Sequence, residues 1–539
     1  MKTRLCFVVM MLAISLAGCS QPVKTPPPMV TLPPTRTPQP VATLEPTATA
    51  TPVEVEDPTP SLSPTSAPAV SDLLGIAWED RAIFRQGLID AEAGALDNLP
   101  GASVYHIDLQ ISDDLFVVRG RQEVRYTNRA DHPLDAVYFR LFPNLMGGAA
   151  TVSEVEVAGQ DADPVYELER SAVRVPLPEP LQPGEHVVIQ MGFEVKLPRD
   201  LEAGYGLFGS FDDMLLLHEC YPVIPVYDDE GWNIEIPSPF ADITYLDASF
   251  YLVRVTALAN LTIVASGVEV SREQQGDNQV LTLASGPSRD FYLTASEDYT
   301  VVSETVGETT VNSYALPERM EGAALALQQA IDALESYGAR FGDYPYTEFD
   351  LVGTPMLALG MEYPGVVTIA HSQYDLDGEV YGQPARLMLE PSVAHEAAHQ
   401  WFYNAVGNDQ LDEPWLDEAL AQYVVGLYFT DIYGEGGDQA WFDALDSRWD
   451  RVERADIPIG MPVSEYTGEE YGAIVYGRGP LFIAALAEEM GQTTFDAFLR
   501  NYYTSHKWDI GTSVDFKQLA EEHCQCDLTS MFEAWVYEK

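Results

Sequence analysis

Two histidines one helical turn apart, with a glutamate beside the first, are the residues of this sequence best suited to chemistry. They form the run His395-Glu396-Ala397-Ala398-His399 inside an apolar segment. Because four residues make about one helical turn, both imidazoles project from one face and can bind one metal ion at about 2.0 to 2.1 Å. Glu396 then lies at the flank where a water on that metal would sit. The pattern predicts a catalytic metal site with Glu396 as its general base.

A third metal ligand is predicted downstream, at Glu418 in the run Trp415-Leu416-Asp417-Glu418. Two helices joined by the loop over 405–413 would pack antiparallel, which brings a first-turn residue of one helix toward the metal face of the other. Two histidines and one carboxylate leave a fourth position for water, as in catalytic rather than structural zinc sites. We therefore predict one Zn²⁺ per chain, held by His395, His399 and Glu418.

These residues resemble those of the aminopeptidase N family of gluzincin zinc metallopeptidases, and the resemblance covers nearly all of 105–539. His395, Glu396, His399 and Glu418 fall on the ligand and base positions of that family. The resemblance implies a peptide hydrolase that releases N-terminal residues. Glu396 would take a proton from a water activated by zinc and return it to the leaving amine.

Upstream, Gly360-Met361-Glu362 is similar to the Gly-x-Met-Glu-Asn strand of the family, whose glutamate binds the free α-amino group of the substrate. The resemblance implies that Glu362 is this anchor and that Gly360 and Met361 lie beside the substrate. Tyr363 stands where the family usually has Asn. In His218-Glu219-Cys220, Glu219 aligns with a segment that offers a second polar contact to the α-amino group.

Downstream, the run Tyr476-Gly477-Arg478-Gly479 is similar to the catalytic tyrosine segment of the family. The resemblance implies that Tyr476 stabilises the oxyanion, with Tyr471 as a weaker supporting candidate. The sequence ends 121 residues after Glu418, so we expect this member to lack the large C-terminal helical domain of many relatives. One alternative is therefore a zinc endopeptidase with an open cleft. The other alternative is a surface lipoprotein that has no catalytic activity.

The elements that must position these residues are predicted from the spacing of apolar side chains. Apolar and polar residues alternate from Tyr105 and again around Phe139 and Phe193, so residues 101–305 are predicted as an N-terminal antiparallel β domain. The period becomes helical near Pro317.

Residues 306–539 are predicted as a mainly helical, thermolysin-like zinc peptidase domain, which makes the fold class multidomain α+β. Its predicted helices include 391–404, 414–433 and 479–490, the first two with Pro391 and Pro414 in their first turns.

The N-terminal segment is typical of an exported bacterial lipoprotein. Lys2 and Arg4 precede an apolar run, which predicts a signal peptide over 1–18. Leu16-Ala17-Gly18-Cys19 resembles a lipobox, so Cys19 is the expected lipidation site. Residues 19–70 carry this cysteine and a Pro/Thr-rich stretch expected to be a disordered linker, and 71–100 is predicted as a lead-in helix. We expect an extracytoplasmic protein, lipid-anchored to a bacterial cell membrane.

The acidic composition narrows the possible partners. The chain has 83 Asp and Glu against 29 Lys and Arg, a formal charge of -54, which repels phosphate backbones and argues against nucleic acid. Peptides and the membrane are the expected partners, and the oligomeric state is left open. Besides Cys6 and Cys19 the chain has only Cys220, Cys524 and Cys526. Three thiols make no disulfide framework, and their pairing is left open.

Overall fold

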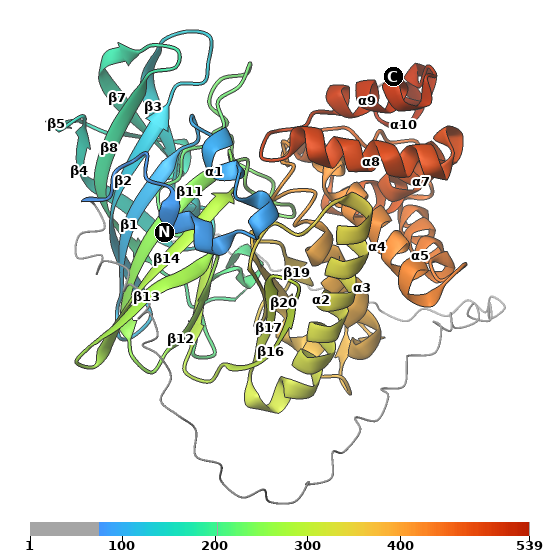
Figure 1. The fold of residues 1–539 in the computed structure, drawn as a ribbon, viewed down its shortest axis with the longest axis horizontal. Coiled ribbons are helices and arrows are strands. Elements are labelled where there is room, and N and C mark those ends of the chain that lie inside the picture. The colour runs from blue at the N-terminus through green and yellow to red at the C-terminus, as the bar shows by residue number, and fades with distance from the viewer. Residues whose placement is uncertain (1–74, 202, 538–539) are drawn as a thin grey trace, which may run out of the picture. The chain divides into compact units, whose positions relative to one another are not determined.

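The computed structural model describes residues 75–201 and 203–537 (Figure 1). The signal peptide, Cys19 and the Pro/Thr-rich linker lie outside these residues. Within them the first half of the chain is built from strands and the second half mainly from helices, which confirms the predicted fold class. No helix in the described part of the chain combines the length and the apolar character needed to cross a membrane.

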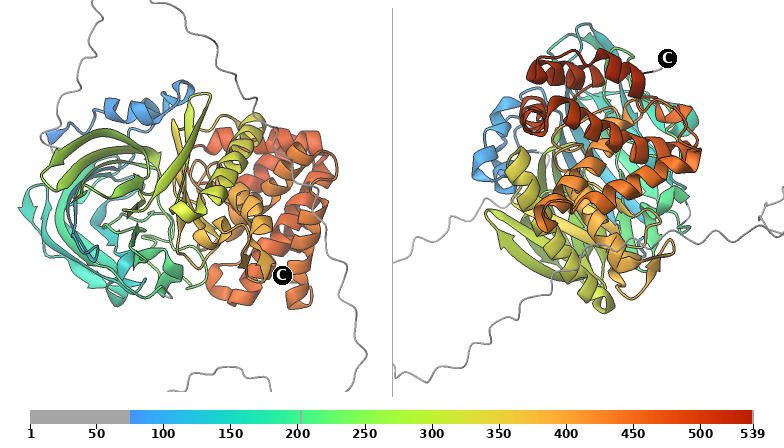
Figure 2. Two further views of the ribbon diagram at one scale, coloured as in Figure 1. Left: turned by 90° about the horizontal axis from the view of Figure 1, so that it is seen from below. Right: turned by 90° about the vertical axis from the view of Figure 1, so that its right-hand side faces the viewer.

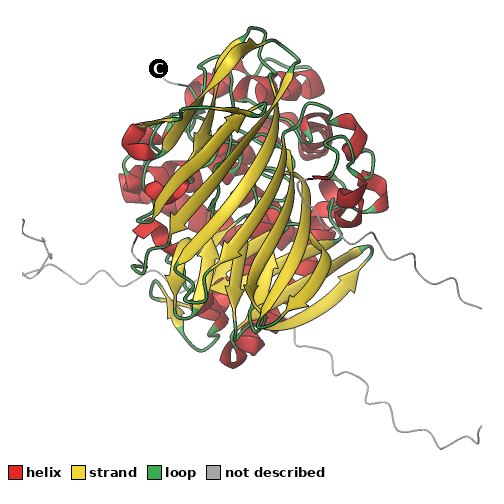
Figure 3. Cartoon of the chain, turned by 90° about the vertical axis from the view of Figure 1, so that its left-hand side faces the viewer, coloured by secondary structure: helices red, strands yellow, loops and turns green. Residues whose placement is uncertain are grey.

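An eight-stranded sheet dominates the first half, and Figure 3 looks onto it with the helices behind. Its strand order is β13-β14-β11-β1-β2-β8-β4-β5. All its pairings are antiparallel except that of β1 with β11, which is parallel and departs from the predicted all-antiparallel domain. The strands are β1 (Val104–Ile111), β2 (Val117–Thr127), β4 (Ala149–Val157), β5 (Gln160–Asp161), β8 (His186–Lys196), β11 (Ser249–Leu258), β13 (Val268–Gln275) and β14 (Asn278–Ser288).

Two smaller sheets complete this half of the chain. The apolar residues of β1 and β8 whose alternation predicted strands are buried in one core with the inner residues of these sheets. The first sheet contains β3 (Leu134–Arg140), β6 (Val165–Glu167) and β7 (Ala172–Leu181). The second contains β9 (Phe208–Phe211), β10 (Met214–Leu217), β12 (Thr262–Ala265) and β15 (Leu293–Ser296).

The predicted lead-in helix is replaced by short turns. The chain forms 3₁₀ turns at Ala82–Gly87 and Asp90–Glu92 and one helical turn, α1 (Ala95–Asn98). Leu88 is extended and forms a β-bridge with Tyr346, a pairing that no helix could make. Phe84 packs on the large sheet against Phe250, and Figure 2 shows this blue segment along the outside of the sheet. Tertiary packing therefore overrides the helical spacing, and Gly87 and Gly94 weaken a continuous helix further.

The second half of the chain contains a five-stranded sheet of order β16-β17-β18-β20-β19. Its first strand begins before residue 306, so the pairing of this sheet crosses the predicted domain boundary. β19 lies at the edge of the sheet. The strands are β16 (Thr300–Val306), β17 (Thr309–Ala315), β18 (Glu348–Thr354), β19 (Gly360–Met361) and β20 (Val366–Ala370), followed by the hairpin β21 (Glu379–Val380) and β22 (Gln383–Pro384).

The helices pack around one apolar core that includes Trp401 and Trp415. The helix predicted over 479–490 is confirmed as α7. The helices of this half are α2 (Met320–Phe341), α3 (Ala385–Ala398), α4 (Glu418–Tyr433), α5 (Gln439–Trp449), α6 (Gly468–Ala473), α7 (Gly479–Met490), α8 (Gln492–His506), α9 (Ser513–Cys524) and α10 (Thr529–Trp535).

Two of the predicted helices have wrong boundaries, and both helices carry residues of the site. α3 begins at Ala385, so Pro391 is inside the helix rather than in its first turn, and the helix ends at Ala398 instead of 404. Pro414 opens a separate 3₁₀ turn, and α4 starts only at Glu418. After α3 the chain turns through Tyr403, whose φ is 138°, which no helix accommodates.

Candidate active site

The last turn of α3 and the first turn of α4 bring three possible metal ligands together. The Nε2 atoms of His395 and His399 are 3.2 Å apart. Oε2 of Glu418 lies 3.2 Å from Nε2 of His395 and 3.7 Å from that of His399. Two ligand atoms at about 2.1 Å from a tetrahedral zinc are roughly 3.4 Å apart, so the three atoms are spaced to bind one ion. Oε2 of Glu418 is buried and accepts no hydrogen bond from the described residues.

The neighbouring groups hold these ligands in orientation. Nδ1 of His399 lies 3.0 Å from the carbonyl oxygen of Phe402, which fixes the tautomer that leaves Nε2 free to bind a metal. Asp417 accepts the backbone N–H of Glu418 at 2.7 Å through Oδ1 and the side-chain amide of Gln410 at 2.8 Å through Oδ2. The side chains of the possible ligands are thus held in place by neighbouring backbone and side-chain groups.

The charges of the site favour an ionised ligand carboxylate. Burial opposes ionisation of Glu418, but the close approach of His395 and His399 outweighs burial and holds the pKa of Glu418 below the ordinary value. Burial lowers the pKa of His399, yet the charges of Glu362 and Glu418 prevail and raise it. For Glu396, burial and then the charge of Glu362 raise the pKa well above the ordinary value. A carboxyl of that kind can hold a proton between two steps of a reaction.

The edge strand β19 passes directly beside Glu396. A Cβ on Gly360 would lie 2.1 Å from Oε1 of Glu396, so this close approach needs a glycine. Met361 is half-buried beside it. Glu362 is buried, and its carboxylate, that of Glu396 and the ring of His399 have atoms within 4.8 Å of one another. The structure therefore brings the predicted amine anchor and the predicted base to one place.

Tyr363, the departure from the family motif, is a packing residue. Its ring stacks on Tyr292 at 3.9 Å with 6° between the planes, and its hydroxyl lies 2.8 Å from Nδ1 of His218. Its carbonyl accepts the amide of Gln400 at 3.1 Å, on the segment that follows His399. Tyr363 thus fixes the backbone next to Glu362, and its buried side chain leaves the anchoring carboxylate in place.

Glu219 is buried close to another acidic residue, Asp290. It is buried with φ of 44°, and neither of its carboxylate oxygens has a hydrogen-bond partner among the described residues. Burial and then the charge of Asp290 raise its pKa well above the ordinary value. Burial and then the charges of Asp290 and Glu219 raise the pKa of Tyr403 well above the ordinary value. No hydrogen bond joins Glu219 to the other site residues that the structure describes.

Tyr476 reaches the site from a single π-helical turn, Ile474–Arg478, between α6 and α7. Such turns are frequent at functional sites. Its hydroxyl donates to Oε1 of Glu418, and its ring centroid is 6.2 Å from that of His395. The ring of Tyr471 packs edge-on against it at 5.5 Å. Arg478 points elsewhere and binds the carbonyl of Ala534 at 3.1 Å.

Sequence reasoning missed the contribution of the β-rich half to this site. Asp242 is half-buried there and shares a hydrogen bond with Glu418. Phe240 packs on Tyr471 at 5.7 Å, and Thr244 donates to Oε1 of Gln410 at 3.0 Å. These residues lie in a loop without periodicity, so the sequence carries no local signal that could place them.

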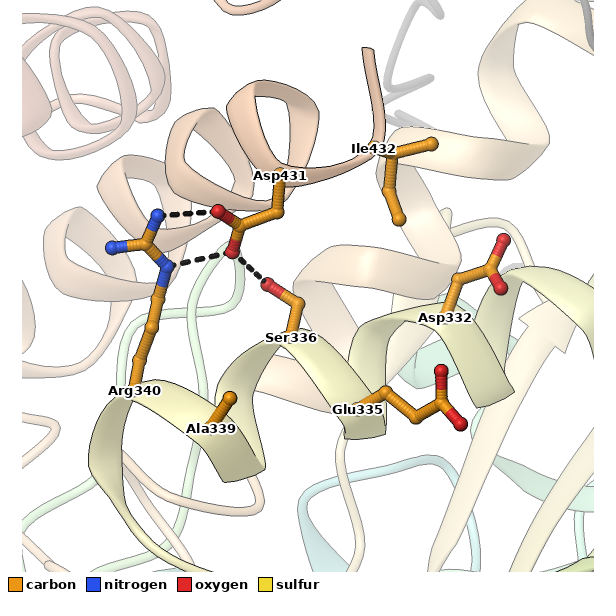
Figure 4. Close-up of a pocket in the computed structure, with 7 residues that line it drawn as sticks. All are labelled: Asp332, Glu335, Ser336, Ala339, Arg340, Asp431 and Ile432. Atoms are coloured by element: carbon orange, nitrogen blue, oxygen red, sulfur yellow. Dashed lines mark hydrogen bonds and ion pairs between the residues drawn. The ribbon is translucent and has the colours of Figure 1, made fainter. Parts of the chain in front are cut away.

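A separate cavity of about 350 Å³ lies between α2 and α4 (Figure 4). Arg340 donates to both carboxylate oxygens of Asp431 at 2.6 and 2.7 Å, and Ser336 donates to Asp431 at 2.6 Å. These polar groups satisfy one another, so they present no ligand set. Among the cysteines that the structure describes, Cys524 and Cys526 form a disulfide, and Cys220 is free and buried.

Curated relatives with similar sequences are aminopeptidases. The chain is 24% identical over 272 residues to aminopeptidase 2 of Candida albicans, which is 48% of this chain and 29% of the relative. It is 28% identical over 283 residues to endoplasmic reticulum aminopeptidase 1 of Homo sapiens, which is 51% of this chain and 30% of that protein. The matched stretch thus spans less than a third of the length of these two relatives.

Solved structures share the fold. The M1 zinc metallopeptidase from Deinococcus radiodurans, as a mutant bound to a Tyr-Ser-Ala substrate, superposes with a TM-score of 0.59 at 20% identity and covers 81% of this chain and 93% of its own. The same enzyme without that substrate gives a TM-score of 0.56 at 21% identity, covering 81% of this chain and 93% of its own.

The fold is similar to that of a two-domain M1 zinc metallopeptidase. The sequence of the helical half supports a narrower assignment than the fold, because residues 325–535 match the peptidase family M1 domain. This stretch is therefore a peptidase family M1 domain, and the resemblance to the aminopeptidase N family is confirmed.

Proposed function

We propose that this chain is a zinc-dependent aminopeptidase that releases N-terminal residues from peptides. The observation that carries the proposal is the position of Glu362. A buried carboxylate at the end of an edge strand, next to Glu396 and His399, suits the α-ammonium of a peptide whose first bond lies at the metal. The aminopeptidase relatives support the same activity.

The chemistry that a metal would supply here is that of zinc. His395, His399 and Glu418 offer two nitrogens and one oxygen, a donor set that suits zinc. An ion held by them would act as a Lewis acid and lower the pKa of a bound water toward about 7.

The residues of the chain perform the proton transfers and stabilise charge. Glu396 takes the proton of the attacking water and delivers it to the leaving amine, since its raised pKa lets it hold that proton. The hydroxyl of Tyr476, which donates to Glu418 in this structure, would turn to the carbonyl oxygen that becomes negative. Glu362 binds the ammonium and so sets which bond is cut.

Substrates with free and acetylated N-termini test the proposal. Glu362→Gln should lower kcat/KM for free peptides by on the order of 10² or more, because it removes a buried charge that faces an ammonium. Rates on acetylated peptides should change little. Equal cleavage of both peptides by the wild type, lowered equally by Glu362→Gln, would make Glu362 structural and favour the endopeptidase alternative.

We further propose that the protein is held at a bacterial membrane through lipidated Cys19, outside the cytoplasm. The support is the sequence alone, in the apolar run before Leu16-Ala17-Gly18-Cys19. Cys19→Ala should move the protein from the membrane fraction to the soluble fraction of the host. An unchanged distribution would refute this anchor.

A further inference from the structure

Three residues with exposed hydrophobic side chains are joined by hydrogen bonds on the chain segment that leads into β19. Leu357 is 40% exposed, Tyr205 42% and Tyr381 74%. The backbone N–H of Leu357 donates to the carbonyl of Tyr205 at 2.8 Å, and the hydroxyl of Tyr381 donates to the carbonyl of Leu357. They come from three separate segments: the loop before β9, the approach to β19, and the turn between β21 and β22. We call these three residues the rim.

The rim lies in the direction in which a bound peptide must continue. With its ammonium at Glu362 and its first peptide bond opposite Gly360, next to Glu396, a substrate runs antiparallel to β19. Leu357 is three residues before Gly360. Residues 357–359 form a bend, so Leu357 lies within the roughly 10 Å that three extended residues would span beyond the cleaved bond. A peptide therefore meets the rim at about its third to fifth residue.

We propose that the rim is a binding subsite for large apolar side chains at the third to fifth residues of peptide substrates. This rests on the proposed function, because Glu362 and Glu396 fix the direction and register of the peptide. The enzyme then distinguishes peptides by a residue that it does not release in that turnover.

The contacts at the rim select side chains rather than backbone. Both backbone polar groups of Leu357 are already paired, with Tyr205 and Tyr381, so they do not pair with an incoming strand. What remains available is apolar surface from two rings and one aliphatic side chain, and burying it favours an apolar partner. Continuity with the strand beside the base makes the substrate itself the occupant.

The test compares the amides of Ala-Ala-Ser-Leu-Gly and Ala-Ala-Ser-Ser-Gly with the zinc enzyme. The wild type should show a kcat/KM about tenfold higher for the peptide with Leu, the effect expected for partly burying one leucine. Leu357→Ser and Tyr381→Ser should each reduce this ratio to about threefold or less. Tyr381→Phe keeps the ring and should retain the preference. Val165→Ser changes a side chain of similar exposure (49%) on β6 and should also retain it.

The rim proposal is wrong if the wild type cleaves the two pentapeptide amides with kcat/KM values within about twofold of each other. It is also wrong if the preference for the peptide with Leu persists in the Leu357→Ser, Tyr381→Ser double variant. Cleavage of Ala-Ala amide separates the two proposals. If Ala-Ala amide is cleaved but the two pentapeptide amides are cleaved equally well, only the rim proposal fails. If no peptide with a free N-terminus is cleaved, the proposed function fails as well. A double variant that changes the sedimenting mass but not the ratio would show that the rim binds a second copy of the chain, which also contradicts the proposal.

Discussion

At the scale of single residues, Glu396 is the side chain whose removal should separate metal binding from catalysis. Glu396 faces Gly360 and lies close to His399 and Glu362. It does not belong to the group His395, His399 and Glu418, whose ligand atoms are spaced to share one ion. Glu396→Gln should therefore keep bound zinc while kcat falls by about 10² to 10⁴. His399→Ala is the control and should lose the metal. Turnover and zinc content measured together decide it, and near-normal turnover at full occupancy would exclude the assignment.

Tyr476 is expected to act only as charge develops on the substrate. Its hydroxyl donates to Glu418 from a π-helical turn, so Tyr476→Phe should lower kcat by about 10² to 10³ with little change in KM. Tyr471→Phe is the matched control because its ring packs against Tyr476, and its effect should be smaller. If Tyr476→Phe lowers the melting temperature with kinetics intact, then Tyr476 is a packing residue.

At the scale of elements, a buried arginine connects the β-rich half to the loop that follows α3. Arg289 donates to the carbonyls of Tyr403 at 2.7 Å, Asp509 at 2.6 Å, Leu246 at 3.2 Å and Ala405 at 3.3 Å. Arg289→Met leaves these acceptors buried without a donor and should lower the free energy of unfolding by about 3 kcal/mol or more. Urea denaturation measures it. Arg272→Met, at a half-exposed pair with Glu269, should cost less than about 1 kcal/mol.

Elements also show which parts of the structure could be predicted from sequence. The period of two predicted β1 and β8, and the one-turn spacing of His395 and His399 predicted a shared helical face, because these signals are local. The helix predicted before residue 100 failed because Phe84 and Leu88 are placed by contacts with Phe250 and Tyr346, distant in sequence. The hydrogen bond of Asp242 with Glu418 could not be predicted either, because these two residues are also distant in sequence.

At the scale of the whole molecule, buried carboxyls and the net charge act in the same direction. Burial is the first cause that raises the pKa of Asp290, Glu348 and Asp409, each to about 7. Unfolded carboxyls titrate near pH 4, so the folded state binds more protons between pH 4 and 7. Stability from these groups is therefore present at low pH and is lost as the pH rises through 7. Self-repulsion from a formal charge of -54 also grows with pH.

The metal-free protein should therefore melt at a higher temperature at pH 6 than at pH 8. Asp290→Asn tests the buried part of this effect, because an amide cannot ionise while its oxygen can still accept the hydroxyl of Tyr403. One group with a pKa of about 7 changes the free energy of unfolding by about 1 kcal/mol between these pH values. The variant should lose that share of the difference, measured by urea denaturation at both pH values with a chelator present. Salt should reduce only the share that comes from surface repulsion. A pH dependence unchanged in Asp290→Asn and abolished by salt would show that surface charge alone sets the acid preference.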